Sequence, residues 1–423
     1  MLMLNVMKSR TSETTRRLSL QKAAATAVSL AAAVTLLASC SQASNGTSPA
    51  TAITAARCGT GPKVAPGQQN QLLGLVADVG TGNLYPVNLG TDKVGHPISI
   101  GFGAEAIAIT PNGKQVYVAD GGYATASSLS NYKSSPVFNG TIVPINLVTG
   151  QAGKPISAGF GPIAIAVTPN GKQAYVADMG LLGGLGRRSF AVDGYTVDEI
   201  NTATDRTDGT FRVGPGPGAI AITPNGKWAY VAVTGTPLHV ANYIVPMNLA
   251  TGKIGKPIHT GISPMAIAIT PNGKWAYVAN TGWPQKQGHT VTPVNLATNI
   301  PGKPIPVGSA PLSIAITPNG KWAYVANSGY GLGKNFTVTP INLTTNTPGK
   351  PITVGPGPTW VAITPNGKWA YVADSGRIGN RGKEVTPINI AQNCAGVPIH
   401  IGVSPQAIAI ASEPATIVAK LTG

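Results

Sequence analysis

The stretch Ala266–Asn280, AIAITPNGKWAYVAN, decides the fold of this 423-residue chain. It consists of two short runs with a period of two, joined by Pro271-Asn272-Gly273. Asn-Gly supplies the positive backbone angles that a tight hairpin needs, and proline cannot continue a central strand. The stretch therefore predicts two antiparallel strands joined by a short turn.

This hairpin recurs along the chain in six intact copies. Their turn prolines are Pro111, Pro169, Pro224, Pro271, Pro318 and Pro365. After the copy at Ala266 come a third strand, Thr290–Leu296, a Pro-Gly-Lys turn and a short fourth strand, Pro304–Val307. Four short strands in each period of about 40–50 residues are typical of a β-propeller blade. The apolar spacing of a helical repeat is absent.

The two ends of the chain complete the repeat. The six full units begin at Ala106, Ile163, Ala219, Ala266, Ser313 and Trp360. Gln406–Ala411 resembles a further first strand, and Leu84–Leu89 and Pro97–Ile100 resemble the outer strands that it lacks. Thr416–Lys420 resembles its second strand, although Leu72–Asp78 competes for that position. We therefore predict an all-β fold over residues 71–423, a seven-bladed β-propeller of four-stranded antiparallel blades. Pairing of the N- and C-terminal strands would close the ring and leave no free inner edge.

The repeat resembles the YVTN family of β-propellers, whose units carry a Pro-Asp/Asn-Gly-Lys turn followed by Tyr-Val-Ala-Asn. The resemblance covers roughly residues 71–423 and implies the propeller fold. It does not imply one activity, because such propellers occur in surface proteins, in lactonase-like enzymes and in subunits of redox enzymes.

Residues 1–39 have the pattern of a bacterial signal peptide, with basic residues before the apolar run Ala23–Leu37. Leu37-Ala38-Ser39-Cys40 resembles a lipobox, which implies that Cys40 carries lipid and becomes the mature N-terminus. The Arg16-Arg17 pair resembles a twin-arginine signal, although Ser19 stands where phenylalanine is preferred. The alternative is an ordinary secretory signal that is cleaved elsewhere. Residues 40–70 are rich in Ser, Thr, Gly and Pro and predict a flexible tether, with a reach of about 30 Å.

Two cysteines remain besides Cys40. Cys58 precedes the first expected strand, and Cys394 lies in the outer turn of the neighbouring unit. An exported chain meets oxidising conditions, so this pair predicts a disulfide.

Basic residues are expected on one face of the propeller. Without residues 1–39 the chain has 25 basic and 13 acidic residues, a net charge of +12. The turns between strands one and two carry Lys114, Lys172, Lys227, Lys274, Lys321 and Lys368. We also assign Lys154, Lys256, Lys303 and Lys350 to the turns between strands three and four, on the same face. Such a face would attract phospholipid head groups or an anionic wall polymer. Alternatively, the lysines serve turn chemistry and solubility alone.

The opposite face carries the loops between strands two and three, which differ in every unit. They contain the candidate ligand-binding residues Tyr123, Tyr132, Trp283 and Tyr330. Loops on a rigid scaffold commonly carry function. The alternative is that these loops are tolerated insertions.

Few residues point to catalysis. The five histidines have no metal-ligand spacing, which predicts no metal site and no cofactor. Asp198, Asp205 and Asp208 belong to an acidic cluster that is expected to be solvated. Asp120, Asp178 and Asp374 end second strands, where turn capping accounts for them. The Trp residues that follow four of the turn lysines are expected to pack between blades.

The sequence favours a non-enzymatic, membrane-tethered extracytoplasmic propeller that acts as a binding or surface scaffold. Its expected partners are the cell membrane, through the lipid anchor, and an anionic envelope polymer or a protein. Nucleic acid is not expected, because the chain is exported and has no known binding module. The alternative is a lactonase-like hydrolase on the same fold, suggested by fold analogy alone.

Overall fold

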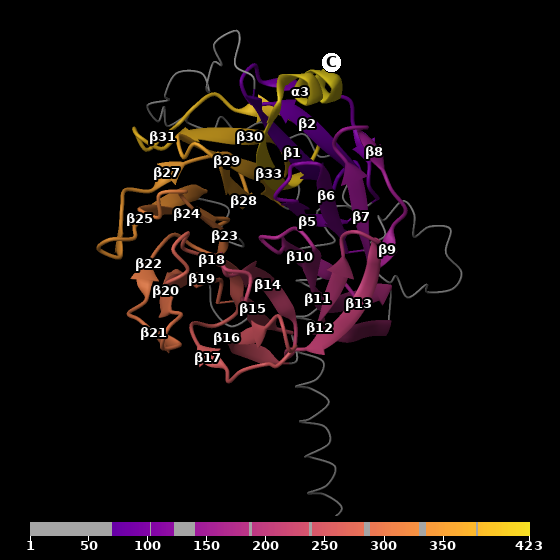
Figure 1. Ribbon diagram of the computed structural model, residues 1–423. Coiled ribbons are helices and arrows are strands. Elements are labelled where there is room, and N and C mark those ends of the chain that lie inside the picture. Colours follow the sequence, from indigo (N-terminus) through magenta and orange to yellow (C-terminus); the bar gives the residue numbers. More distant parts are fainter. Residues whose placement is uncertain are drawn as a thin grey trace, which may run out of the picture.

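Seven β-sheets are arranged in a ring around a central axis (Figure 1). The computed structural model describes residues 70–101, 103–121, 140–185, 188–236, 239–282, 288–329, 336–377 and 380–423. Neighbouring strands within each sheet are antiparallel. The predicted seven-bladed propeller is therefore confirmed.

We number the blades in chain order, from one at β5 to seven at the chain ends. The inner strands of blades one to seven are β5 (Ala104–Ile109), β10 (Pro162–Val167), β14 (Pro217–Ile222), β18 (Pro264–Ile269), β23 (Pro311–Ile316), β28 (Pro358–Ile363) and β33 (Pro405–Pro414). The second strands are β6 (Gln115–Asp120), β11 (Gln173–Leu185), β15 (Trp228–Gly235), β19 (Trp275–Asn280), β24 (Trp322–Asn327), β29 (Trp369–Arg377) and β1 (Asn70–Asp78). The third strands are β7 (Thr141–Asn146), β12 (Arg188–Asn201), β16 (Val240–Asn248), β20 (Thr290–Asn295), β25 (Thr337–Asn342), β30 (Asn380–Asn389) and β2 (Asn83–Asn88).

The outer strand is interrupted in five blades. The paired segments are β8 (Gln151–Ala152) and β9 (Ile156–Ser157), β21 (Ile300–Pro301) and β22 (Ile305–Pro306), β26 (Thr347–Pro348) and β27 (Ile352–Thr353), β31 (Cys394–Ala395) and β32 (Ile399–His400), and β3 (Lys93–Val94) and β4 (Ile98–Ser99). The other two blades have one outer strand each, β13 (Arg206–Arg212) and β17 (Ile258–His259).

The turn that defines the repeat is held by its own side chains. Thr270 Oγ1 donates to Asn272 Oδ1 at 2.7 Å and accepts from the Trp275 amide at 3.1 Å. The Lys274 amide donates to the same Asn272 oxygen at 3.0 Å. Gly273 takes the left-handed backbone angle, with φ at 68°. The same contacts form in all six turns, which explains why the Thr-Pro-Asn-Gly-Lys motif is repeated without change.

Blade seven joins the two ends of the chain. β33 pairs with β1 from Asn70 opposite Pro414 to Asp78 opposite Pro405. Leu72–Asp78 therefore supplies the second strand. The assignment of Thr416–Lys420 as that strand is wrong, because that segment belongs to the helix α3 (Ala415–Thr422).

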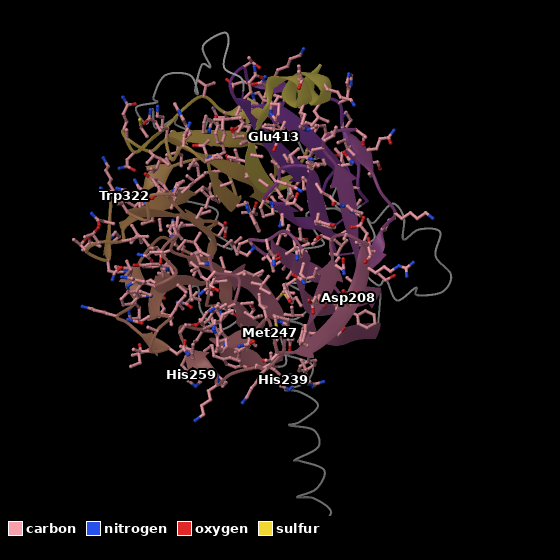
Figure 2. The ribbon with its side chains drawn as sticks, viewed as in Figure 1. Asp208, His239, Met247, His259, Trp322 and Glu413 are labelled. Carbon is pink, nitrogen blue, oxygen red and sulfur yellow. The ribbon has the colours of Figure 1, made fainter. Side chains whose placement is uncertain are left out.

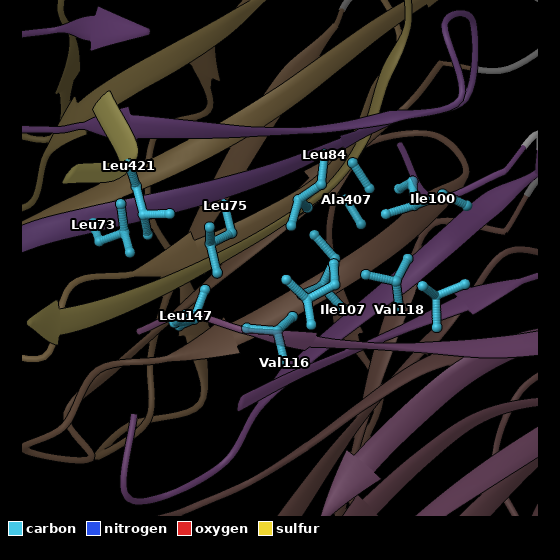
Figure 3. Packing of buried hydrophobic residues seen from close by; sticks show 14 of the residues in the cluster. Leu73, Leu75, Leu84, Ile100, Ile107, Val116, Val118, Leu147, Ala407 and Leu421 are labelled. Atoms are coloured by element: carbon cyan, nitrogen blue, oxygen red, sulfur yellow. The ribbon is translucent and has the colours of Figure 1, made fainter. Parts of the chain in front are cut away.

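Helix α3 packs on the outside of this closure. Its buried residues Val418 and Leu421 join a core cluster with Leu73, Leu75 and Leu147 (Figure 3). The cluster thus includes residues from both ends of the chain and from blade one. No helix in the described ranges is long and apolar enough to span a membrane.

A second set of lysines is not where the sequence predicted it. Lys154, Lys256, Lys303 and Lys350 were expected in the turns between strands three and four. In blade one, Ile145 pairs with Ala152 and Ile142 pairs with Ile156, so Lys154 lies in the interruption halfway along the outer strand. The other three lysines occupy the corresponding positions, and all four are exposed on the rim of the ring.

Candidate functional site

The two faces of the ring differ in chemistry. Each inner strand runs from a face formed by the loops after strands two and four, here the loop face, to a face formed by the turns after strands one and three, here the lysine face. Second strands are almost completely buried, whereas every inner strand contains partly exposed residues. Because blades cover both sides of an inner strand, its exposure comes from the edge that faces the central axis.

A one-residue bulge interrupts every inner strand near the loop face. In blade four, Pro264 pairs with Asn280 and Ala266 with Ala279, which leaves Met265 without a register partner. A bulge residue is free of the ladder and can be aimed differently from its neighbours. The seven bulge residues are Glu105, Ile163, Gly218, Met265, Leu312, Thr359 and Gln406.

Three consecutive bulge residues form a polar sector of this ring. Gln406 Nε2 donates to Glu105 Oε2 at 2.9 Å, and Thr359 Oγ1 donates to the Gln406 carbonyl oxygen at 2.9 Å. Gln406 Oε1 is buried and has no hydrogen-bond partner among the described residues. The other four bulge residues are apolar or glycine. The sector therefore offers hydrogen-bond acceptors beside an apolar surface.

Glu105 is the one ionisable group in this polar sector. Its side chain is buried, with only 5% of the residue exposed. Burial raises the pKa of the Glu105 carboxyl to about 7, and the charge of Asp120 contributes in the same direction. Such a group can accept or release a proton at neutral pH. The sequence analysis did not select Glu105, because a lone glutamate in an Ala-Ile strand carries no motif.

The polar residues at the ends of the second strands hold the loops that lead into the inner strands. Asn280 Oδ1 accepts from the Gly261 amide at 3.0 Å, and Asn280 Nδ2 donates to Thr292 Oγ1 at 3.0 Å. In blade seven, Asp78 accepts from the amides of Val403 and Ser404. These contacts support the interpretation of this position as a cap.

Blade two places two carboxyls together at this position. Asp178 is fully buried, and its Oδ1 lacks a hydrogen-bond partner among the described residues. Asp198 accepts from Thr210 Oγ1 at 2.7 Å and from the Gly159 amide at 2.9 Å. Burial, followed by the nearby Asp198, raises the pKa of Asp178 to about 8.

The expected solvated acidic patch is therefore wrong for Asp198, which is buried. Its neighbours in sequence have separate contacts: Asp205 accepts from the Tyr117 hydroxyl at 2.7 Å, and Asp208 accepts from Asn201 at 3.0 Å (Figure 2). The described ranges contain no group of three or more His, Cys, Asp or Glu residues that could hold a metal ion.

The lysine face carries the six lysines of the turns between strands one and two. All six turn lysines are exposed: Lys114, Lys172, Lys227, Lys274, Lys321 and Lys368. Their carbonyl oxygens accept from the residue that follows the third strand, as in the 3.0 Å bond from the Leu296 amide to Lys274. The turns after strands one and three are therefore joined, which fixes the lysines along this face.

The tryptophans after four of these lysines pack largely between blades. Trp275, Trp322 and Trp369 lie against core clusters that contain residues of two adjacent blades. Trp228 is more exposed, at 37%. The expectation of packing between blades is confirmed for the first three.

Several predicted site residues lie outside the described residues. These are Cys40, Cys58, Tyr123, Tyr132, Trp283 and Tyr330. Cys394 begins β31 and is disulfide-bonded. Since its expected partner Cys58 is not described, the pairing of these two residues stays a prediction.

The chain is similar in fold to several solved structures. A chain of hydrazine synthase from Kuenenia stuttgartiensis has 19% sequence identity and a TM-score of 0.59, covering 81% of this chain and 99% of that one. A functionally unknown protein from Desulfotomaculum acetoxidans has 17% identity and a TM-score of 0.58, covering 80% and 98%. A protein from Bacteroides fragilis described as a 6-phosphogluconolactonase by inference has 16% identity and a TM-score of 0.59, covering 82% and 99%. No model of a known family and no curated protein matches the chain. At these identities the likeness establishes the propeller fold alone.

Proposed function

We propose that this protein is a non-enzymatic, extracytoplasmic binding scaffold, held on the bacterial cell membrane by a lipid on Cys40. The propeller presents its loop face to a protein partner, and residues 1–39 direct export.

The observation that carries this proposal is the place where the N-terminal segment joins the ring. β1 begins at Asn70, opposite Pro414, at the end of β33 that lies on the lysine face. Glu413 pairs with Gln71 in this ladder. The Glu413 carboxylate lies against Gly113, since a Cβ atom added to Gly113 would be 2.2 Å from Glu413 Oε1. Gly113 belongs to a lysine-face turn. A tether at Asn70 thus leaves the whole loop face turned away from the anchor.

The anchor is tested by mass spectrometry of the mature N-terminus and by cell fractionation. We expect diacylated Cys40 as the first residue and the protein in the membrane fraction. The variant Cys40→Ser should leave the membrane fraction, while Cys58→Ser, a matched serine substitution, should remain there. An unmodified Cys40 still joined to Ser39 would contradict the proposal.

A second candidate, a lactonase-like hydrolase, is favoured by the Glu105 carboxyl and by the fold shared with proteins described as 6-phosphogluconolactonases by inference. Glu105 accepts a hydrogen bond from Gln406 and is affected by the charge of Asp120. Neither Gln406 nor Asp120 is a cation that could bind the phosphate group of a phosphorylated lactone. Lactone opening should be measured for the wild type and for Glu105→Gln. The scaffold proposal predicts no turnover above buffer by either protein, and turnover that Glu105→Gln abolishes would establish the hydrolase.

A further inference from the structure

The charge on the lysine face is unevenly distributed. In blades three to six, the turns after strands one and three contain no acidic residue; they span residues 223–228, 248–253, 270–275, 295–299, 317–322, 342–346, 364–369 and 389–393. The acidic residues that the described chain places at this face are in blades two and seven, namely Asp92, Asp205, Asp208 and Glu413. One side of the face is therefore purely basic.

This basic side also carries the tryptophans. In each of its four blades a turn lysine is followed by the tryptophan that starts the second strand, and we name these eight residues the Lys–Trp arc. They are Lys227, Trp228, Lys274, Trp275, Lys321, Trp322, Lys368 and Trp369. Beside the arc, Ile300 at the start of β21 is 63% exposed. Basic side chains interleaved with partly exposed tryptophan suit the boundary between water and a bilayer, where tryptophan is enriched.

The N-terminal segment reaches the ring from this same face, at Asn70. If residues 41–69 form the flexible tether that the sequence predicts, with a reach of about 30 Å, an anchored Cys40 would keep the arc within reach of the bilayer. Contact between the arc and the bilayer would then be an intramolecular step, which makes weak contacts effective.

We propose that the Lys–Trp arc docks on an anionic phospholipid bilayer. Exposed lysines beside the phosphate groups supply the attraction, and the ring of Trp228, which is 37% exposed, enters the head-group layer. Docking tilts blades three to six toward the membrane and keeps the loop face directed outward. This inference rests on the proposed function for the proximity of a membrane, although the surface itself is testable without the lipid.

The test uses residues 41–423, which contain every described strand and carry no lipid. Binding is measured by flotation with vesicles of phosphatidylcholine alone and with vesicles containing 30% phosphatidylglycerol, at low and physiological salt. We expect binding to the anionic vesicles only, falling as salt rises, because exposed charges are screened over about 8–10 Å at physiological ionic strength.

Two quadruple variants of identical charge separate the arc from net charge. The first replaces Lys227, Lys274, Lys321 and Lys368 with glutamine. The second replaces the rim lysines Lys154, Lys256, Lys303 and Lys350 in the same way. Each lysine near an anionic surface is worth roughly fivefold in affinity, so replacement of the four arc lysines should cost about 600-fold, whereas the rim variant should lose less than about fivefold. Trp228→Ala should weaken binding without changing its salt dependence, and thermal melting should be unaltered in all three variants.

Equal binding to both vesicle types, or equal losses in the two quadruple variants, would overturn the docking proposal. So would binding to purified anionic wall polymer in the absence of binding to vesicles. Since these measurements need no lipid on Cys40, an unmodified Cys40 would remove the proposed anchor while leaving the docking result intact.

Discussion

The Tyr277 hydroxyl of blade four donates a 2.8 Å hydrogen bond to Asn346 Oδ1 in the outer turn of blade five. Asn346 has a positive φ of 56°, a conformation that asparagine tolerates better than most residues. The same bond joins Tyr230 to Asn299 and Tyr324 to Asn393. Each of these three hydrogen bonds links consecutive blades through the tyrosine side chain of the repeat.

The pairing also explains two departures from the repeat. Gly252 stands at the asparagine position of blade three, and Tyr175 of blade two turns instead to Glu199 of its own blade, at 3.0 Å. Leu75 replaces the tyrosine in blade seven, and the following turn has Gly150. In both places the turn lacks its asparagine, and the tyrosine of the preceding blade is either replaced or makes a different contact.

We expect Tyr277→Phe to destabilise the ring by about 0.5–1.5 kcal/mol, because it removes the part-buried hydrogen bond to the exposed Asn346 side chain. Burial raises the pKa of Tyr277 to about 12, so the hydroxyl remains protonated at ordinary pH. Chemical denaturation should be measured for Tyr277→Phe, for Asn346→Gly, which retains the backbone angle, and for the double variant. Simple additivity of the two single effects would show that the hydrogen bond does not couple the blades.

The Asp178 carboxyl should make stability depend on pH. Its pKa is about 8 in the folded protein and near 3.8 when unfolded, so the folded state retains a proton that the unfolded state has released. Stability should therefore fall as pH rises from about 4 to about 8.

Asp178→Asn should reduce that fall. Asp198 occupies the register position of Thr292 in blade four, where Asn280 Nδ2 is the donor. An amide at position 178 could donate to Asp198 in the same way. Denaturation midpoints at pH 5 and pH 8 should differ less in Asp178→Asn than in the wild type, and Asp208→Asn, at an exposed position, serves as the control. An unchanged pH dependence in Asp178→Asn would contradict this assignment.

Two truncations distinguish the roles of α3 and β33. Removal of residues 415–423 exposes the surface that Val418 and Leu421 cover, so the ring should still close but melt at a lower temperature. Removal of residues 405–423 uncovers the inner edge of β1 and should give an aggregating protein. Circular dichroism and size-exclusion chromatography test both. Equal behaviour of the two truncations would mean that α3, rather than strand pairing, completes blade seven.

A disulfide between Cys58 and Cys394 should stabilise the domain by roughly 2–5 kcal/mol. It would also fix residues 59–69 against blade six and leave only residues 41–57 as a free tether. Peptide mapping without reduction should recover the two cysteines in one cross-linked peptide. A linkage of Cys394 to Cys40 would exclude both this pairing and the lipid on Cys40.

The hairpin at Ala266–Asn280 predicted the fold because its contacts are local: Thr270, Asn272 and Gly273 satisfy the turn among themselves. The end of the chain was harder to assign. Thr416–Lys420 contains β-branched residues, as a strand would, yet Leu72–Asp78 pairs along the full length of β33, and the remaining segment buries Val418 and Leu421 at the i, i+3 spacing of a helix.

The polar sector could not be predicted from the sequence, for a different reason. A bulge shifts the register by one residue without disturbing the alternation of Ala and Ile that marks the strand. Glu105 and Gln406 are 301 residues apart in sequence and meet only because the ring closes.

The position of Asn70 also determines how the ring bears a mechanical load. A pull through the N-terminal segment acts along β1, which runs from the lysine face into blade seven between β33 and β2. The hydrogen bonds of an antiparallel ladder are perpendicular to its strands, so this force shears both ladders at once instead of opening them bond by bond. A cell-surface protein held at that end would resist flow with the same strands that close its ring.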